Sequence, residues 1–238
     1  QLNALIQTRV REDGDTLNPE SITVLDPACG SGHILVVAYD VLKAIYLERG
    51  YRQRDVPQLI LEKNLFGLDI DERAAQLTGF ALMMKGRADD RRLFERGVKL
   101  NVMALVDSAG FDSEVLAPLI RHSREGGNPN YGLTPENLTE LKRLFEHATT
   151  FGSLIQVPEG LTEKLPALKQ LSEATSQDLF VSEALKRLGP LVQQAEMLAA
   201  QYDSVVANPP YMGGRNGMND ALKSFSEANF PSGKADIY

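Results

Sequence analysis

The sequence lacks several features that would place it among secreted or membrane proteins. Its 238 residues include no tryptophan and a single cysteine, Cys29, so no disulfide can form within the chain. No apolar run is long enough to cross a membrane, and no charged and then apolar leader is present. We therefore expect a cytoplasmic protein that has no membrane partner.

Histidine is also scarce, and acidic residues outnumber basic ones. The three histidines, His33, His122 and His147, are scattered and do not combine with Cys29 into a metal-binding spacing, so we predict no metal site. The 25 basic and 32 acidic residues give a net charge of −7, although phosphate binding normally requires a basic surface. To bind a nucleic acid, the protein would need either basic residues gathered on one face of this chain or a DNA-binding surface outside this chain. We favour the second.

A strand, a glycine turn and a helix are predicted near the start of the chain. The β-branched run 22–26 ends in Asp26, a turn follows over 27–33, and an apolar-periodic helix follows over about 34–47. Gly30 and Gly32 let the backbone pass close to a ligand, and the N–H groups that open the helix can meet a carboxylate. A dinucleotide fingerprint would require glycine at Leu35, and the turn lacks the Lys-Ser/Thr of a phosphate loop.

A second buried strand is predicted over 64–71. It ends in acids, and a carboxylate at such a strand tip can accept both hydroxyls of a ribose. Asp69 lies 37 positions after Gly32, whereas a dinucleotide site places its acid roughly 20 positions on. We expect Asp71 to cap the following helix, 72–85.

A third motif, Asn208-Pro209-Pro210-Tyr211, follows the apolar run 205–207, which we expect to be a buried parallel strand. The two prolines have no N–H and stiffen the loop, so the carbonyls of Asn208 and Pro209 are presented as acceptors. Two close acceptors suit an amine with two hydrogens, and Tyr211 offers a flat face for stacking. The motif therefore predicts a clamp for an amino group on a planar ring.

The region between these motifs is less clearly patterned. The third strand is either 98–107, whose Asp107 could then reach a cofactor's adenine, or 151–157. Either choice leaves a largely helical insertion that contains a mobile loop over 121–132. Apolar residues at helical spacing over 182–202, interrupted at Gly189 and Pro190, predict a crossover helix that leads into the final strand.

The motifs Asp-Pro-Ala-Cys-Gly-Ser-Gly and Asn-Pro-Pro-Tyr, in that order, resemble those of the S-adenosylmethionine-dependent DNA methyltransferases that modify the N6 amine of adenine. Segments 24–85 and 193–238 are most similar to the PglX methyltransferases of BREX-type phage-defence systems. The resemblance implies an α/β, Rossmann-like class I methyltransferase sheet, mostly parallel with helices on both faces, incomplete at both ends and carrying a helical insertion. It implies four divisions: a lead-in over 1–21, a cofactor-binding half over 22–106, the insertion over 107–181, and the crossover helix with the catalytic strand and loop over 182–238.

The resemblance also implies S-adenosylmethionine as the cofactor and double-stranded DNA with a flipped adenine as the partner, with other defence proteins as further partners. Asp69 would bind the ribose and Ile70 would pack on the cofactor's adenine. Cys29 is expected to be a small buried residue rather than a nucleophile. Two alternatives stay open: methylation of another amine (an RNA base, cytosine N4 or protein glutamine), and a non-catalytic binding module. The implied catalytic residues are Asn208, Pro209, Pro210 and Tyr211, and the implied cofactor-binding residues are Asp26, Pro27, Ala28, Cys29, Gly30, Gly32, Asp69, Ile70 and Asp107.

Overall fold

The computed structural model describes residues 18–122, 132–208 and 219–230, and it divides the chain into two compact units. The first unit comprises Gln1–Met103 and Tyr202–Asn208, and the second comprises Ala104–Gln201 and Pro209–Tyr238. Each unit is described by itself below. No helix within the described ranges is long and apolar enough to cross a membrane.

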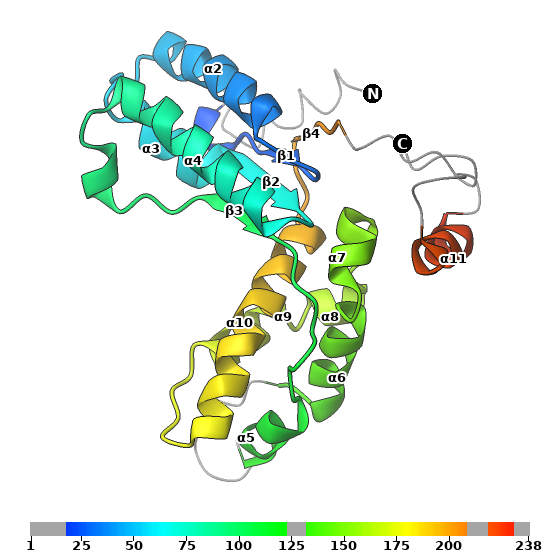
Figure 1. Cartoon of the computed structure of the whole chain (residues 1–238). Helices are drawn as coiled ribbons and strands as arrows, with labels where there is room; N and C mark the ends of the chain where they lie inside the picture. The colour runs from blue at the N-terminus through cyan, green and yellow to red at the C-terminus, as the bar shows by residue number, and fades with distance from the viewer. Residues whose placement is uncertain (1–17, 123–131, 209–218, 231–238) are drawn as a thin grey trace. The chain divides into compact units, whose positions relative to one another are not determined.

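The sheet contains four parallel strands in the order β3-β2-β1-β4 (Figure 1). Val24 of β1 lies opposite both Leu65 of β2 and Ser204 of β4. This arrangement confirms the α/β, Rossmann-like fold class, because short parallel strands alternate with helical crossovers. The strands are β1 (Val24–Asp26), β2 (Leu65–Asp69), β3 (Asn101–Ala104) and β4 (Ser204–Val205).

β3 resolves the choice between the two candidates for the third strand. It lies within 98–107, whereas the competing segment 151–157 contains the end of helix α7 (Ala148–Phe151) and a 3-10 turn, η5 (Gly152–Leu154). Gly152 has a φ of +58°, which turns the chain away from an extended path. Phe151 and Leu154 therefore lie in helical turns, and residues 155–157 follow without forming a strand.

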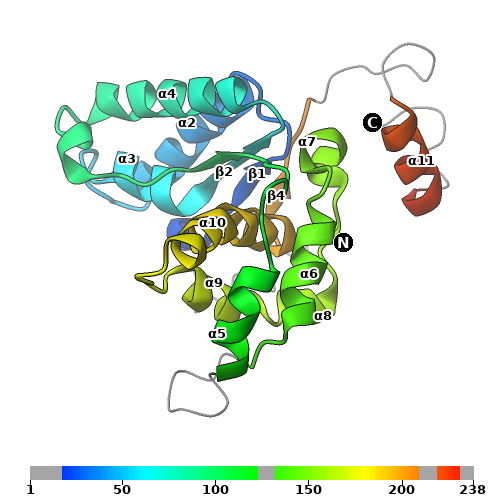
Figure 2. The same ribbon diagram turned by 60° about the horizontal axis from the view of Figure 1, so that its bottom comes forward.

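Two long helices, α2 (His33–Glu48) and α4 (Glu72–Asp89), lie side by side over the sheet (Figure 2). They cover the same face because successive right-handed crossovers move in one direction across the sheet, from β1 to β2 to β3. The side chains that α2 buries follow the helical repeat, and they pack in one core cluster with residues of β2 and α4. The buried residues of α2 are Leu35, Tyr39, Leu42 and Tyr46.

Polar contacts join the middle of α2 to the carboxyl end of α4. Asp89 accepts hydrogen bonds from the Tyr39 hydroxyl at 3.1 Å and from Lys43 at 2.5 Å, and Lys85 pairs with Asp40 at 2.7 Å. The other helical segments of this unit are short. They are η1 (Pro19–Ser21), α3 (Val56–Leu59), the π turn η2 (Ile60–Asn64) and η3 (Leu93–Arg96).

β4 differs from the buried strand that its apolar sequence predicts. It is parallel to β1, as expected, but Val205 is 58% exposed and Val206 is 43% exposed. The expectation of burial was wrong: β4 is the last strand in the order, and among the described elements it packs chiefly against β1 rather than under a helix.

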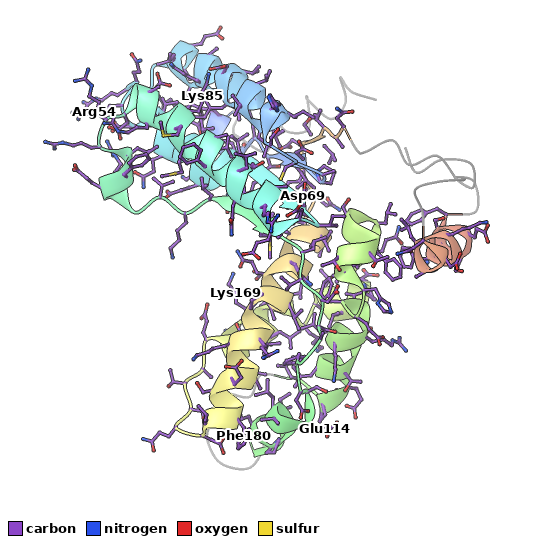
Figure 3. The ribbon with its side chains drawn as sticks, in the orientation of Figure 1. Arg54, Asp69, Lys85, Glu114, Lys169 and Phe180 are labelled. Carbon is purple, nitrogen blue, oxygen red and sulfur yellow. The ribbon has the colours of Figure 1, made fainter. Side chains whose placement is uncertain are left out.

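The second unit is helical over its described residues, apart from the end of β3. Its longest helix, α10 (Leu179–Ala199), packs against α9 (Leu165–Ser172), and Lys169 of α9 pairs with Glu196 of α10 (Figure 3). α10 continues through Pro190, contrary to the predicted interruption, because Pro190 is exposed and water can reach the carbonyl that it leaves unbonded. The other segments are η4 (Glu114–Leu116), α5 (Ala117–His122), α6 (Pro135–Leu144), α8 (Glu159–Thr162) and α11 (Asp220–Asn229).

Several predicted features lie outside the described residues. They are most of the lead-in over 1–21, most of the loop over 121–132, and the residues Pro209, Pro210 and Tyr211 of the amine clamp.

Candidate active site

The turn after β1 is bonded to the tip of β2. The Cys29 N–H donates to the Leu68 carbonyl at 2.9 Å, and the Gly32 N–H donates to the Cys29 carbonyl at 2.7 Å. Asp26, at the end of β1, is 1% exposed and accepts a hydrogen bond from the Ala28 N–H at 3.1 Å. The backbone that links β1 to α2 is therefore held in one conformation at the carboxyl end of the sheet, where open α/β sheets bind their ligands.

The two glycines of this turn serve different purposes. Gly32 has a φ of +80°, and a Cβ at this position would lie 2.9 Å from Thr78 Oγ1, so packing against α4 excludes a side chain there. Gly30 has a φ of +52°, and a Cβ there would meet nothing within 4 Å. Thr78 donates its hydroxyl to the Gly30 carbonyl at 2.9 Å. The Gly30 position of the turn is thus open, whereas its Gly32 position is packed.

Asp69, at the tip of β2, bonds to the same turn (Figure 3). Its Oδ2 accepts a hydrogen bond from the Gly30 N–H at 2.8 Å, and its Oδ1 accepts one from the Asp71 N–H at 2.9 Å. A carboxylate has about four acceptor positions, so a half-buried Asp69 can still accept hydrogen bonds from a ligand. Ile70, next along the chain, is 44% exposed and offers an apolar surface beside that carboxylate. Asp71 caps α4 by accepting from the Arg73 N–H, as predicted.

The first turn of α2 can receive an anion. Its N-cap is Gly32, which has no side chain to bond the first backbone N–H groups, and no acidic residue lies in the first turn. Backbone N–H groups at a helix start carry partial positive charge and bind carboxylates or phosphates when no side chain caps them. The turn and the helix start therefore combine open space at Gly30 with hydrogen-bond donors.

The electrostatics of the turn keep Cys29 unreactive. Burial raises the pKa of the Cys29 thiol to about 11; the contact with Thr78 opposes the rise, and the charges of Asp69 and Asp26 add to it. The thiol is 5% exposed and stays protonated at neutral pH, whereas a nucleophilic cysteine needs a lowered pKa. The prediction that Cys29 is a small buried residue is confirmed. Burial also raises the pKa of Asp26; the Ala28 N–H opposes this shift and Asp69 reinforces it.

β4 leads Asn208 toward the same edge of the sheet. The Val206 N–H donates to the Leu25 carbonyl at 2.9 Å, so the chain still runs beside β1 just before Asn208, which is exposed. Three hydrogen bonds between Thr23 and Asp203 fix the start of this strand. Asp203 Oδ2 accepts from the Thr23 N–H at 2.8 Å and from its hydroxyl at 3.0 Å, and the Asp203 N–H donates to Thr23 Oγ1 at 3.0 Å.

Asp107 belongs to the second unit, and its carboxylate is engaged there. It accepts hydrogen bonds from the Thr149 N–H at 2.8 Å and from the Thr149 hydroxyl, at the start of α7. A role of Asp107 toward a cofactor stays a prediction.

Sequence patterns did not indicate three residues that shape this site: Thr78, Thr23 and Asp203. Each acts through a contact with a residue far away in the chain, and none belongs to a motif. Of the three, only Asp203 could have been noticed in the sequence, because it is an acid that directly precedes β4.

Comparison with known proteins shows the family to which the chain belongs. The model of the Eco57I restriction-modification methylases matches residues 63–238, about three quarters of the chain. The chain belongs to the Eco57I restriction-modification methylase family. A second model, the DNA-methyltransferase domain of MmeI, matches residues 16–105, which include the glycine turn and Asp69.

Two curated proteins are similar to this chain over nearly its whole length. The adenine-specific methyltransferase BrxX of Escherichia coli O9:H4 (strain HS) is 51% identical over 94% of this chain. The adenine-specific methyltransferase PglX of Lacticaseibacillus casei (strain Zhang) is 36% identical over 96% of it. The expected resemblance to PglX is thereby confirmed. The chain spans about a fifth of the length of each of these relatives.

Proposed function

We propose that this chain carries the cofactor site and the amine clamp of an enzyme that transfers a methyl group from S-adenosylmethionine to the N6 amine of adenine in DNA. The observation that supports the proposal most directly is the geometry around Asp69. A strand-tip carboxylate holds an open glycine turn, and β4 carries Asn208 along the same edge of the sheet.

The residues of the turn fit S-adenosylmethionine in three respects. The open position at Gly30 lets the cofactor approach the backbone, and the uncapped start of α2 can meet its carboxylate. Asp69 has acceptor positions left for the ribose hydroxyls, and the exposed Ile70 can pack on the adenine ring. Asp26, Pro27, Ala28, Cys29 and Gly32 support this site by holding the turn in shape.

The proposed chemistry is a direct transfer: the amine nitrogen would gain the methyl group as that group's bond to the sulfonium breaks. The donor would leave as a neutral thioether, and the amine would lose one proton to water. When bound, the cofactor supplies an electrophilic methyl group on a sulfonium. Asn208 Oδ1 and the carbonyl of Pro209 accept the two hydrogens of the adenine amine, which draws the nitrogen lone pair out of the ring and aims it at the methyl group. Tyr211 stacks on the base. These contacts strengthen as the nitrogen becomes tetrahedral, so they favour the transition state over the ground state.

DNA is the proposed substrate because similar proteins are named adenine-specific methyltransferases and the family is one of restriction-modification methylases. An adenine inside a duplex cannot reach an amine clamp, so the target base must be flipped out of the stack. We further propose a role in phage defence or restriction-modification, with other defence proteins as partners.

Titration calorimetry tests the cofactor site. We expect the chain to bind S-adenosylmethionine saturably and to show no heat of binding with NAD. Binding of NAD alone, or of neither compound, would contradict the proposed cofactor. The distinction is sharp because Leu35 stands where a dinucleotide turn needs glycine.

A further inference from the structure

The second unit contains a pocket that the proposed amine clamp does not use. It has a volume of about 250 Å³ and lies among α6, the α7–η5 turn and α11. A volume just below the usual range of ligand pockets, roughly 300–1,000 Å³, suits a single base or nucleotide better than a larger molecule. Its lining includes Arg143, Phe151, Ile155, Gln156, Phe225 and Asn229.

Aromatic rings form one wall of this pocket. Phe151 and Phe225 stack face to face, with centroids 4.1 Å apart and planes 13° from parallel, and both rings are half-buried. His147 meets the Phe151 ring edge-on at 5.7 Å. Phe151 and Phe225 come from helices far apart in the sequence, α7 and α11, which contact each other. Each ring covers one face of the other, so the pair can offer a ligand only its ring edges and the two outer faces.

Polar groups surround the aromatic wall. Arg143 and Gln156 are exposed, and the ion pairs found among the described residues do not include Arg143. Asn229 donates its Nδ2 to the Phe225 carbonyl at 2.8 Å, which leaves its Oδ1 as an acceptor. A nucleotide site requires an aromatic surface for the base, a cation for the phosphate and polar groups for the base edge. This pocket offers stacked rings, a guanidinium available to an anion, and amide groups at its rim.

We propose that this pocket binds one unstacked nucleotide of single-stranded DNA. The base stacks on the outer face of one ring of the Phe151–Phe225 pair, the amides of Gln156 and Asn229 bond to its edge, and the Arg143 guanidinium binds the adjoining phosphate. Stacking on an aromatic face tolerates any base, so the pocket holds a strand without reading its sequence. The inference rests on the proposed function to the extent that DNA is the substrate.

Fluorescence anisotropy of the 238-residue chain with a labelled ten-nucleotide oligothymidylate tests this proposal. We expect Phe225→Leu and Arg143→Gln each to weaken binding by roughly tenfold, because each removes one stacking or phosphate contact. Phe225→Tyr keeps the ring and should retain binding, which separates a lost contact from a misfolded α11. Matched controls are Phe180→Leu, at an exposed ring of α10, and Arg49→Gln, at an exposed guanidinium after α2. Both controls should change the affinity by less than about twofold.

Photo-crosslinking locates the contact independently. An oligonucleotide carrying 5-iodouracil should crosslink to a peptide that contains Phe151 or Phe225. Crosslinks elsewhere only, or unchanged affinity in both pocket variants, would overturn the proposal. Thymidine monophosphate should compete only at far higher concentration than the oligonucleotide, and equal competition would identify a site for free nucleotides instead.

Calorimetry with S-adenosylmethionine on the same variants separates the two proposals. The pocket variants should bind the methyl donor as the parent chain does. If the donor binds but the pocket substitutions leave oligonucleotide affinity unchanged, the pocket inference alone fails. If those substitutions weaken oligonucleotide binding but the donor does not bind, the proposed cofactor site alone fails.

Discussion

At the scale of single residues, the carboxylate of Asp69 joins three parts of the first unit: the tip of β2, the glycine turn and the start of α4. Asp69→Ala should weaken S-adenosylmethionine binding by roughly ten- to a hundredfold, because it removes a charged acceptor and frees the Gly30 N–H. Asp178→Ala is a matched control, since it also removes a carboxylate that caps backbone N–H groups, but in the second unit. Calorimetry showing equal affinities for the two variants would contradict the role of Asp69.

The two glycines of the turn should respond differently to alanine. Gly32→Ala should destabilise the chain by roughly 2–3 kcal/mol, because it combines a left-handed backbone with a contact to Thr78. Gly30→Ala should cost about 1 kcal/mol, since only the backbone is strained, but it should reduce cofactor affinity by filling the open position. Urea unfolding measures the first effect and calorimetry the second. A larger stability loss at Gly30 than at Gly32 would contradict this assignment.

The buried carboxyl of Asp26 makes stability depend on pH. Because burial raises its pKa in the folded chain above the ordinary value of 3.8, ionised Asp26 opposes folding at neutral pH. Asp26→Asn keeps an oxygen for the Ala28 N–H and should be more stable than the parent at pH 7. That advantage should shrink as the pH falls through the raised pKa and vanish below about 3.8, where Asp26 is protonated in both states. Unfolding curves at several pH values test this, and an advantage that grows on acidification would contradict it.

At the scale of elements, the position of β4 depends on the bonds between Thr23 and Asp203. Thr23→Val and Asp203→Ala should each lower the rate of methyl transfer at least tenfold, because Asn208 lies at the end of this short strand and a small displacement misaligns the clamp. The losses should add only in part in the double variant, since both substitutions remove the bond from the Thr23 hydroxyl to Asp203 Oδ2, and each removes one further bond. Thr162→Val, whose hydroxyl bonds to the nearby Pro158 carbonyl, is the control. Additive losses would show that the two residues act separately.

Elements with a local pattern could be predicted from the sequence, and elements that depend on distant partners could not. The strand, turn and helix over 22–47 were predictable because β-branched residues, glycines and an apolar helical repeat follow one another. The exposure of β4 was not, because its sequence does not reveal that it is the last strand in the order. The segment 151–157 looked like a strand, but its first half lies in helical turns and its second half forms no strand. The contact of Phe151 with Phe225 also depends on tertiary packing alone.

At the scale of the whole molecule, the two proposed binding sites lie in different units. The first carries the turn, Asp69 and Asn208, and the second carries the helical segment and the aromatic pocket. The net charge of −7 remains a reason to expect further DNA contacts from outside this chain. The glycine turn could be predicted from its motif and the clamp stays a prediction, whereas the pocket is assembled from residues without any motif.

The central claim is that Asn208 directs methyl transfer to adenine N6. Its most direct test is incubation of the chain with DNA and methyl-labelled S-adenosylmethionine, followed by nucleoside mass spectrometry, for the parent and for Asn208→Ala. The account predicts labelled N6-methyldeoxyadenosine from the parent and a loss of at least a hundredfold in the variant, with cofactor binding nearly unchanged. Label in N4-methyldeoxycytidine or in protein, or equal transfer by Asn208→Ala, would contradict it.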